Sequence, residues 1–190
     1  MSRDRIVTEA LRLTREVGLA NVSMRALARG LDVPPMTIYS YVPNKEALHG
    51  LVVDHILSEI PIPGPEHGTW EERLRAVLGD ARRVFTDHPG VLSHLGDGGS
   101  TEPLRLAEGV LSILRDGGFS SKAAVLCFTT LYTFMTGQID LDAMSEAVAS
   151  GSSHATLDGV TRIAHFSRDE MFEFGFDAII EGLKLTLLDR

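Results

Sequence analysis

Residues 34–45 hold, within a short stretch, the side-chain types that bind nucleic acid. Hydroxyl, aromatic and cationic groups follow two prolines closely, and they belong to Thr37, Tyr39, Ser40, Tyr41 and Lys45. Hydroxyls and cations hydrogen-bond base edges and phosphates, whereas such a run is poor material for a protein core. The stretch therefore indicates contact with the major groove of DNA.

The residues before this stretch have the pattern of a helix-turn-helix. Ser23 is placed to cap a short helix, because its hydroxyl can accept hydrogen bonds from the N–H groups of the first turn. Apolar residues then recur at helical spacing, at Ala26, Leu27 and Leu31. Asp32 follows where the chain must turn, and Asp tolerates the left-handed backbone conformation better than most residues.

The second helix of the pair is predicted to start at two prolines. Pro34 and Pro35 suit a helix start because the N–H that proline lacks would have no partner there. Val33 is expected to fill the angle between the two helices. In helix-turn-helix proteins the second helix lies in the major groove, where all four base pairs can be distinguished.

These residues resemble the DNA-binding region of the TetR (tetracycline-repressor) family of transcriptional regulators. The resemblance covers residues 6–48 and includes Ser23–Ala28, Thr37-Ile38-Tyr39, Tyr41-Val42 and Asn44–Leu48. Residues 174–183 also resemble the final helix of the tetracycline-repressor-type C-terminal domain. The resemblance implies a dimeric DNA-binding regulator whose second domain binds a small effector.

The family pattern, carried across position by position, implies a set of DNA-contacting residues. These are Arg25, Pro35, Met36, Thr37, Tyr39, Ser40, Tyr41 and Lys45. Thr37 and Ser40 are expected to hydrogen-bond bases or phosphates. Pro35 and Met36 are expected to touch thymine methyl groups.

The remaining candidates are expected at the DNA backbone. Tyr39 and Lys45 would hold phosphates, and Arg25 would reach a base or a phosphate. Two of the candidates have a simpler alternative role. Met36 would only pack against the protein, and Lys45 would only cap its helix together with Asn44.

A second group of side chains is typical of a small-molecule pocket. The candidate ligand-binding residues are His94, Phe128, Leu131, Tyr132, Met135 and Gln138, most of them on one predicted helix. Apolar walls with a few polar groups are what such pockets need. The alternative for each of these residues, taken singly, is that it packs in the hydrophobic core and does not contact a ligand.

The sequence argues against a metal-bound effector. Ser93–Gly96 resembles the segment of tetracycline regulators whose histidine contacts the drug, but Thr133 occupies the position of their metal-binding histidine in the long helix. His88 and His94 lack the spacing of a helical metal pair. We therefore expect a largely apolar or aromatic effector, with no metal and no cofactor.

The charge distribution supports local contact with DNA. The net charge is −8, yet residues 1–48 hold seven Lys/Arg against five Asp/Glu, whereas residues 49–190 hold eleven against twenty-one. A positive surplus confined to the helix-turn-helix segment favours specific sites over indiscriminate coating of DNA. The excess of Asp and Glu in residues 49–190 is explained equally well by solubility alone.

The single cysteine, Cys127, rules out an internal disulfide and suits a reducing cytoplasm, where we expect the protein to act. Its apolar neighbours predict a buried thiol. No apolar run is long enough to cross a membrane, and the N-terminus has no secretory signal. Gly-rich phosphate loops, paired catalytic carboxylates and nucleophile elbows are also absent from the sequence, so no catalytic residues are assigned.

Helical periodicity dominates the chain, and no alternating strand pattern is found. The longer helices are predicted at residues 3–17, 45–60, 69–87, 101–117, 120–146 and 167–188. A short helical turn is expected at residues 91–95, and a break at 61–65. Gly96–Gly99 and residues 149–159 are expected to be flexible.

The final helix, 167–188, is apolar on most sides, and a chain of this size lacks the surface to cover it. Gly175, Ala178 and Gly182 would allow another helix to approach closely. We therefore expect a homodimer through the 120–146 and 167–188 helices, arranged as a four-helix bundle. A central helix in a monomeric bundle is the alternative.

The sequence thus predicts an all-α protein with an N-terminal three-helix helix-turn-helix DNA-binding domain, residues 1–48. Residues 49–190 are predicted to form a C-terminal helical ligand-binding and dimerisation domain. The predicted function is a ligand-responsive regulator, a repressor, that binds palindromic double-stranded operator DNA as a homodimer and is released by a small effector. The alternatives are an effector-independent DNA-binding dimer and, less favoured, a helical enzyme.

Overall fold

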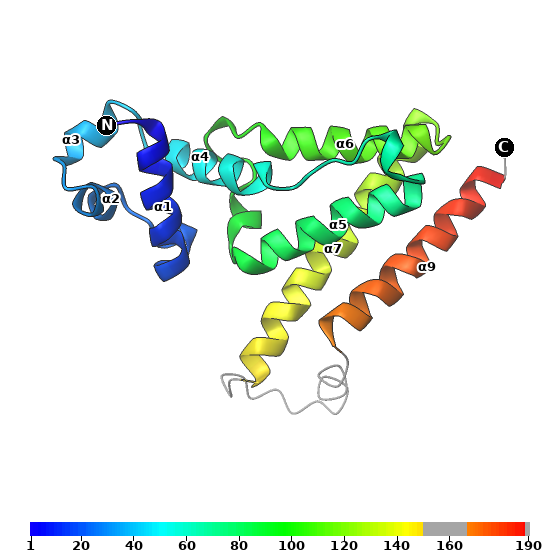
Figure 1. Ribbon diagram of the computed structural model, residues 1–190. Coiled ribbons are helices and arrows are strands. Elements are labelled where there is room, and N and C mark those ends of the chain that lie inside the picture. Colours follow the sequence, from blue (N-terminus) through cyan, green and yellow to red (C-terminus); the bar gives the residue numbers. More distant parts are fainter. Residues whose placement is uncertain (150–166, 189–190) are drawn as a thin grey trace. The chain divides into compact units, whose positions relative to one another are not determined.

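A computed structural model of the chain describes residues 1–149 and 167–188, and all regular structure within these ranges is helical (Figure 1). Side chains are described over residues 1–139 and 167–185. The predicted all-α fold class is confirmed. Most of the loop predicted at residues 149–159 lies outside the described residues.

The chain forms two compact units. The first combines Met1–Ile62 with Gly79–Gly109, and the second combines Pro63–Leu78 with Val110–Arg190. These units divide the chain by internal contacts, whereas the predicted border after residue 48 divides it by function. The border at 48 therefore stays a prediction.

Helix α1 (Arg3–Val17) buries one face in the first unit. The Ser2 hydroxyl accepts the Arg5 N–H at 3.3 Å and so caps its first turn. Ile6, Ala10 and Leu13 are buried at helical spacing. Gly18 ends the helix with a φ of 77°, a conformation that glycine adopts without strain.

A 3-10 turn, η1 (Leu19–Asn21), leads to the two short helices α2 (Met24–Gly30) and α3 (Pro35–Tyr39). Helix α4 (Lys45–Ser58) follows, capped by Asn44, whose side chain accepts the Ala47 N–H at 2.7 Å. Buried residues lie on several sides of α4: Leu48, Val52, Val53, Ile56 and Leu57. Helix α4 packs against α1 and against the turns that follow α5.

The chain continues through η2 (Pro65–His67), α5 (Trp70–Asp87), η3 (Val91–His94), η4 (Asp97–Gly99) and α6 (Glu102–Asp116). Thr69 and Glu72 cap α5 reciprocally, with the Glu72 N–H donating to Thr69 Oγ1 and the Thr69 N–H donating to Glu72 Oε2. Helices α5 and α6 each contribute residues to both units.

The segment Gly96–Gly99, which we expected to be flexible, has regular structure that packs on another helix. It forms η4, which packs closely against α4. A Cβ atom on Gly98 would lie 2.3 Å from the Glu46 carbonyl oxygen, and Gly98 has a φ of 59°. Glycine is required there because the two backbones meet without room for a side chain.

In the second unit, α7 (Ser121–Ala149) packs on α9 (Arg168–Leu188). Leu131 and Met135 of α7 are buried, as are Phe172 and Phe176 of α9. A Cβ atom on Gly175 would lie 2.4 Å from the ring of Phe134. Gly175 therefore allows a close approach between helices, as expected. The helix that approaches it, however, is α7 of the same chain.

Cys127 is buried, as predicted, and burial raises the pKa of its thiol. Among the described helices, none is both long enough and apolar enough to cross a membrane.

Candidate nucleic-acid interface and effector-linked elements

Helices α2 and α3 are joined by a tight turn at Asp32. Asp32 has a φ of 53°, the only positive φ outside glycine in the described residues, which confirms the predicted turn. The Val33 N–H donates to the Ala28 carbonyl at 3.0 Å and closes the end of α2. Ser23 caps the start of α2, accepting the Ala26 N–H at 3.1 Å. These local bonds fix the angle between the two helices.

The inner face of the motif is apolar. Leu27 on α2, Ile38 on α3 and Val42 after α3 are fully buried. Because Ile38 points inward, its neighbours on the short α3 helix point outward. Met36 is 76% exposed and Tyr39 is 44% exposed, and Pro35 and Ser40 are exposed as well. These side chains therefore lie on the surface, where another molecule can contact them.

Three polar candidates are engaged within the protein. Ser40 Oγ donates to the Thr37 carbonyl at 2.7 Å, and Tyr41 Oη donates to the Met1 carbonyl at 3.1 Å. Lys45 Nζ donates to the Ala20 carbonyl at 2.6 Å. A hydroxyl that donates one bond still accepts others, and an ammonium group has three N–H donors. Contact with DNA through these groups stays a prediction.

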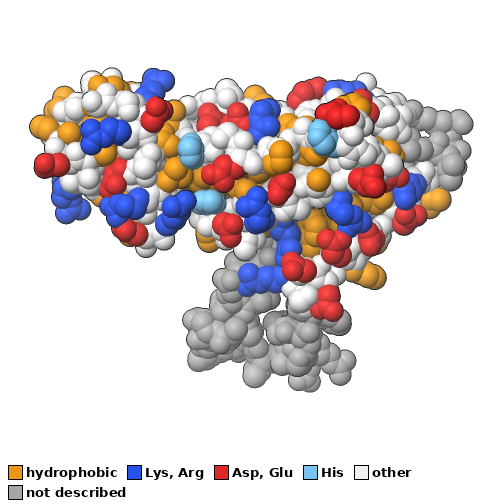
Figure 2. All heavy atoms as spheres, in the orientation of Figure 1, with side chains coloured by type: hydrophobic (Ala, Val, Ile, Leu, Met, Phe, Trp, Pro, Cys, Tyr) orange, Lys and Arg blue, Asp and Glu red, His pale blue; other side chains and the backbone are white. Residues whose placement is uncertain are grey.

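Arg25 lies at a hollow beside the turn. The hollow has a volume of about 490 Å³ and is lined by Ser23, Arg25, Ala28, Arg29, Val33 and Pro35. It therefore places two guanidinium groups next to the exposed start of α3. Figure 2 shows side chains of both charges over α1–α3 and over the later helices, so the positive surplus of residues 1–48 is a small excess and not a continuous basic patch.

The predicted ligand-binding residues fall into two groups. Leu131 and Met135 of α7 are buried, and Phe128 and Gln138 are half-buried. Gln138 Oε1 is buried and has no hydrogen-bond partner, so a polar group is available in this part of the second unit. The Tyr132 ring is exposed and stacks on Phe128 with ring centroids 6.2 Å apart. His94 belongs to the first unit.

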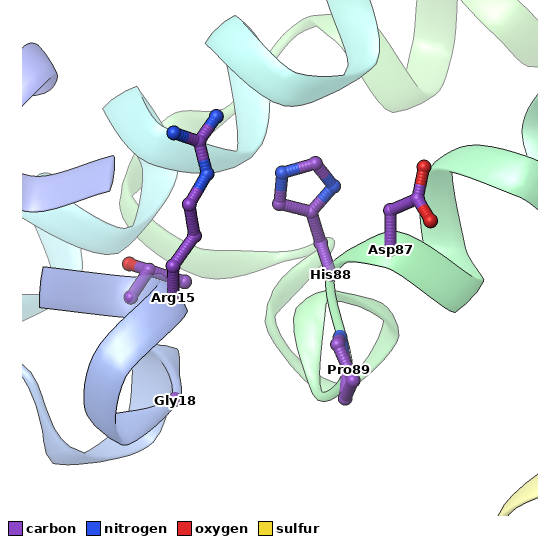
Figure 3. Close-up of a pocket in the computed structure, with 6 residues that line it drawn as sticks. Arg15, Gly18, Asp87, His88 and Pro89 are labelled. Atoms are coloured by element: carbon purple, nitrogen blue, oxygen red, sulfur yellow. The ribbon is translucent and has the colours of Figure 1, made fainter. Parts of the chain in front are cut away.

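A separate hollow lies in the first unit, between the end of α1 and the turn after α5 (Figure 3). It has a volume of about 280 Å³ and is lined by Thr14, Arg15, Gly18, Asp87, His88 and Pro89. Its charged and polar lining does not suit a largely apolar compound, and none of its residues belongs to the predicted ligand set.

Helix α4 is fastened to the start of α6 by two sets of hydrogen bonds. Asp54 Oδ1 accepts the Thr101 N–H at 2.9 Å and the Glu102 N–H at 3.0 Å. In the other direction, Arg105 donates to the carbonyls of Leu57 and Ile60 at 3.0 and 3.1 Å. Each helix therefore satisfies terminal groups of the other, which ties them together mechanically.

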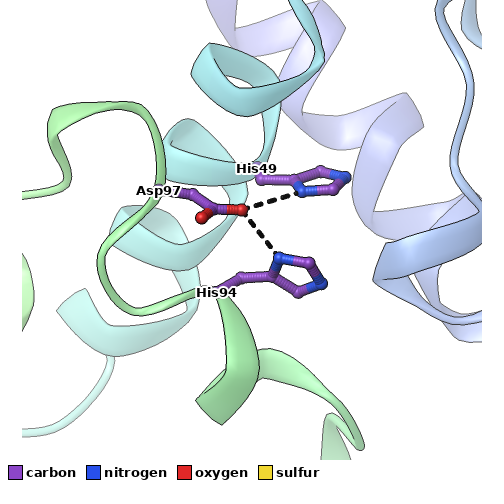
Figure 4. A group of neighbouring side chains, drawn as sticks. All are labelled: His49, His94 and Asp97. Atoms are coloured by element: carbon purple, nitrogen blue, oxygen red, sulfur yellow. Dashed lines mark hydrogen bonds and ion pairs between the residues drawn. The ribbon is translucent and has the colours of Figure 1, made fainter.

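A further contact between α4 and the η3–η4 segment was missed by sequence reasoning. His49 of α4 and His94 of η3 both hydrogen-bond the carboxylate of Asp97 (Figure 4). Only His94 was a candidate, because His49 lies 48 positions from Asp97 and reads as one more residue in a largely apolar helix. The only sequence signal for this contact was that His49, a polar residue, stands at a position of the helix that is otherwise expected to be buried.

The outer faces of α7 and α9 carry exposed apolar side chains. On α9 these include Phe174, which is 79% exposed, and Leu185, with exposed Ala178 and Gly182 between them at helical spacing. On α7, Val125 and Leu126 are exposed. The neighbouring threonines on α7, at 129, 130 and 133, donate their hydroxyls to backbone carbonyls of their own helix. This bonding lowers the polarity that they present to a partner.

Comparison with known families identifies both parts of the chain. Residues 6–50 match bacterial regulatory proteins of the tetR family, and residues 62–167 match the tetracyclin repressor-like C-terminal domain. The helix-turn-helix described above lies wholly within the first match.

Individual proteins agree with these matches. A class E tetracycline repressor protein from Escherichia coli is 25% identical over 201 residues, covering 100% of this chain and 94% of that protein. An HTH-type transcriptional regulator from Saccharopolyspora erythraea is 25% identical over 76% of this chain, which spans only 62% of that protein. The TetR family protein ActR of Streptomyces coelicolor, solved in complex with actinorhodin, has a TM-score of 0.75 and 26% identity, covering 98% of each chain.

Proposed function

The chain belongs to the TetR family of bacterial regulatory proteins, and from this membership we propose that it is a ligand-responsive transcriptional repressor. It binds a palindromic operator as a homodimer, and a small effector releases it. Its activity is binding rather than catalysis, and its place of action is the cytoplasm, where operator DNA is found.

The observation that carries this proposal is the outward face of α3. The Asp32 turn and the buried Ile38 side chain present Pro35, Met36 and Tyr39 to solvent from the outer face of the five-residue helix α3. A short, exposed second helix is the part of a helix-turn-helix that enters the major groove. The DNA-binding domain is accordingly residues 1–48, with Arg25 beside the groove-reading helix.

The roles within this domain follow from chemistry and position. Met36 and Pro35 offer apolar surface to thymine methyl groups, and Thr37 offers a hydroxyl to base edges. Tyr39 and Lys45 are proposed to bind phosphates of the DNA backbone. Arg25 adds a guanidinium that suits either a guanine edge or a phosphate.

Dimerisation is supported by the outer faces of α7 and α9. Phe174 and Leu185 expose apolar area that a second copy of the same helices would cover, as in a four-helix bundle. A two-fold dimer holds its two heads at a fixed separation, and the half-sites of an operator lie about 34–36 Å apart.

The effector is proposed to bind in the second unit along α7, among residues 128–138. Helices α5 and α6 each have residues in both units. A conformational change in the second unit is therefore carried into the first along these two helices. Asp54 and Arg105 then pass a displacement of α6 to α4, which follows directly on the DNA-binding domain. A coupling of about 1–3 kcal/mol is enough to release the operator.

A dimer that binds DNA without any effector is the second candidate, because α7 and α9 also serve dimerisation. A thermal-shift screen of apolar and aromatic compounds against the full-length protein separates the two. Hits are then added to the protein bound to a fluorescent duplex selected from a random library. The proposal predicts compounds that both raise Tm and release the duplex. Compounds that raise Tm and leave duplex affinity unchanged would contradict the effector-released mechanism.

A further inference from the structure

Two histidines and an aspartate converge where α4 meets the η3–η4 segment (Figure 4). His49 Nδ1 lies 3.2 Å from Asp97 Oδ2, and His94 Nδ1 lies 2.7 Å from the same oxygen. The two imidazole rings meet edge to face, with centroids 4.4 Å apart. Three side chains from three separate elements therefore point at one small volume.

The spacing of these atoms fits a metal ion. Around a tetrahedral ion with bonds of about 2.1 Å, two ligand atoms lie about 3.4 Å apart. The potential ligand atoms of the three residues all lie within 4.8 Å of one another. Small side-chain movements would bring them to bonding distance of a single ion.

For two of the three groups, His49 and Asp97, the pKa is shifted toward the form that binds a metal. Burial lowers the pKa of His49, which favours the neutral ring, despite the opposing effect of the Asp97 hydrogen bond. Hydrogen bonds from His94 and His49 lower the pKa of Asp97, so its carboxylate stays ionised. Neutral imidazole and ionised carboxylate are the ligand forms of these side chains.

Access and burial are also suitable. The His49 side chain is only 5% exposed, so its ring is held beside Asp97 by the surrounding protein. The His94 side chain is 18% exposed, so an ion can reach the cluster from the side of η3. The protein thus holds a buried imidazole next to an accessible one.

We propose that His49, His94 and Asp97 form a binding site for one divalent first-row transition ion, of which zinc is the best representative. Two imidazoles and one carboxylate suit zinc, cobalt or nickel, whereas magnesium and calcium prefer oxygen ligands alone. Coordination through Nδ1 displaces the proton shared with Asp97, and in a neutral ring that proton moves to Nε2. Water completes the coordination of the ion.

The site has a mechanical consequence, which rests on the proposed function, whereas ion binding itself does not. A Cβ atom on Gly50 would lie 2.7 Å from the Asp97 carbonyl oxygen, so α4 and η4 already touch beside the cluster. An ion would add bonds between α4 and η3–η4 and hold α4 in one arrangement. The ion would therefore change the affinity for DNA.

Cobalt titration of the full-length protein tests the site, because Co²⁺ bound to histidine and carboxylate absorbs visible light. We expect one Co²⁺ per chain, displaced by Zn²⁺ and not by Mg²⁺. The variants His49→Gln, His94→Gln and Asp97→Asn should each weaken Co²⁺ binding at least tenfold. Loss of a residue that merely hydrogen-bonds a metal ligand already costs about tenfold, and loss of a ligand itself should cost more. The matched control is His55→Gln, exposed on the same helix, which should bind as the wild type does.

His94→Gln is the decisive variant, because His94 is more exposed than His49 and its loss leaves the His49–Asp97 hydrogen bond in place. A rise in Tm on adding Zn²⁺ is expected for the wild type and for His55→Gln, and it should be lost in His94→Gln. No stoichiometric Co²⁺ binding by the wild type, or binding that survives all three substitutions, would overturn the site.

Anisotropy of a selected DNA duplex, with and without Zn²⁺, tests the consequence separately. The mechanical consequence is supported if Zn²⁺ changes the DNA affinity of the wild type and leaves the DNA affinity of His94→Gln unchanged. Unchanged affinity in both would remove the mechanical consequence and leave the ion site standing. No selected duplex at all would instead contradict the proposed function.

Discussion

Asp54 of α4 caps the first turn of α6 at Glu102, whose N–H lies 3.0 Å from Asp54 Oδ1. The same oxygen accepts the Ser100 hydroxyl at 2.5 Å. The cap of one helix is therefore supplied by another helix 48 residues earlier in the chain. This cap makes α4, next to the DNA-binding domain, respond to any displacement of α6.

Asp54→Ala should lower the free energy of unfolding by about 1–2 kcal/mol, the usual cost of losing a helix cap. Chemical denaturation followed by circular dichroism measures it. Asp80→Ala is a matched control, because Asp80 has only a surface pair with Arg83 at 3.2 Å and should cost less than about 1 kcal/mol. Equal losses in the two variants would argue against the cap.

Tyr39→Ala should weaken binding to a selected duplex strongly while leaving the unfolding transition unchanged, because the Tyr39 side chain is largely outside the core. Anisotropy titrations measure the affinity. Leu104→Ala, an exposed residue on α6, serves as the control and should bind like the wild type. Unchanged affinity in Tyr39→Ala would remove this residue from the interface.

Arg25→Ala should weaken DNA binding by about 1–3 kcal/mol if its guanidinium contacts a base, or lower the salt slope by about one if it contacts a phosphate. Arg83→Ala removes the same charge from α5, outside the proposed DNA-binding domain, and should do neither. Titrations at several salt concentrations distinguish these outcomes. Matching effects of Arg25→Ala and Arg83→Ala would mean that only net charge matters.

Phe174→Glu should convert the dimer to a monomer, because it places an unpaired charge in a face that the second copy covers. Light scattering after size exclusion should give 20.7 kDa for this variant and twice that mass for the wild type. Leu104→Glu adds the same charge at another exposed position and should stay dimeric. A wild-type protein that is monomeric at micromolar concentration would contradict the dimer itself.

Tetracycline with magnesium should not bind tightly, even though a tetracycline repressor is among the relatives. Thr133 stands at the position of the metal-binding histidine of tetracycline regulators, and a neutral hydroxyl is a poorer metal ligand than an imidazole. Tetracycline fluorescence, titrated with and without Mg²⁺, measures this directly. Strong binding that requires Mg²⁺ would refute the expectation of a metal-free effector.

The helix-turn-helix was predictable because its signals are local. The Ser23 cap, the turn at Asp32 and the helix start at Pro35 each depend on bonds within a few residues. Helix boundaries in the second unit were also predictable, since Ser120 and Ser167 cap their helices within three positions.

The contacts of α4 were not predictable, because they join residues about 48 positions apart. Thr101 reads as the cap of α6, yet the oxygen that accepts the N–H groups of that turn belongs to Asp54. Four residues rich in glycine, Gly96–Gly99, indicate flexibility, yet their lack of side chains is what lets them pack on α4. Composition alone does not separate these two uses of glycine.

Selection of bound sequences from a random duplex library by the full-length protein tests the central claim most directly. A dimeric repressor should enrich one inverted repeat whose half-sites lie about one helical turn apart, bound by two chains per duplex. Enrichment of no sequence, or of a single half-site bound by one chain, would contradict it.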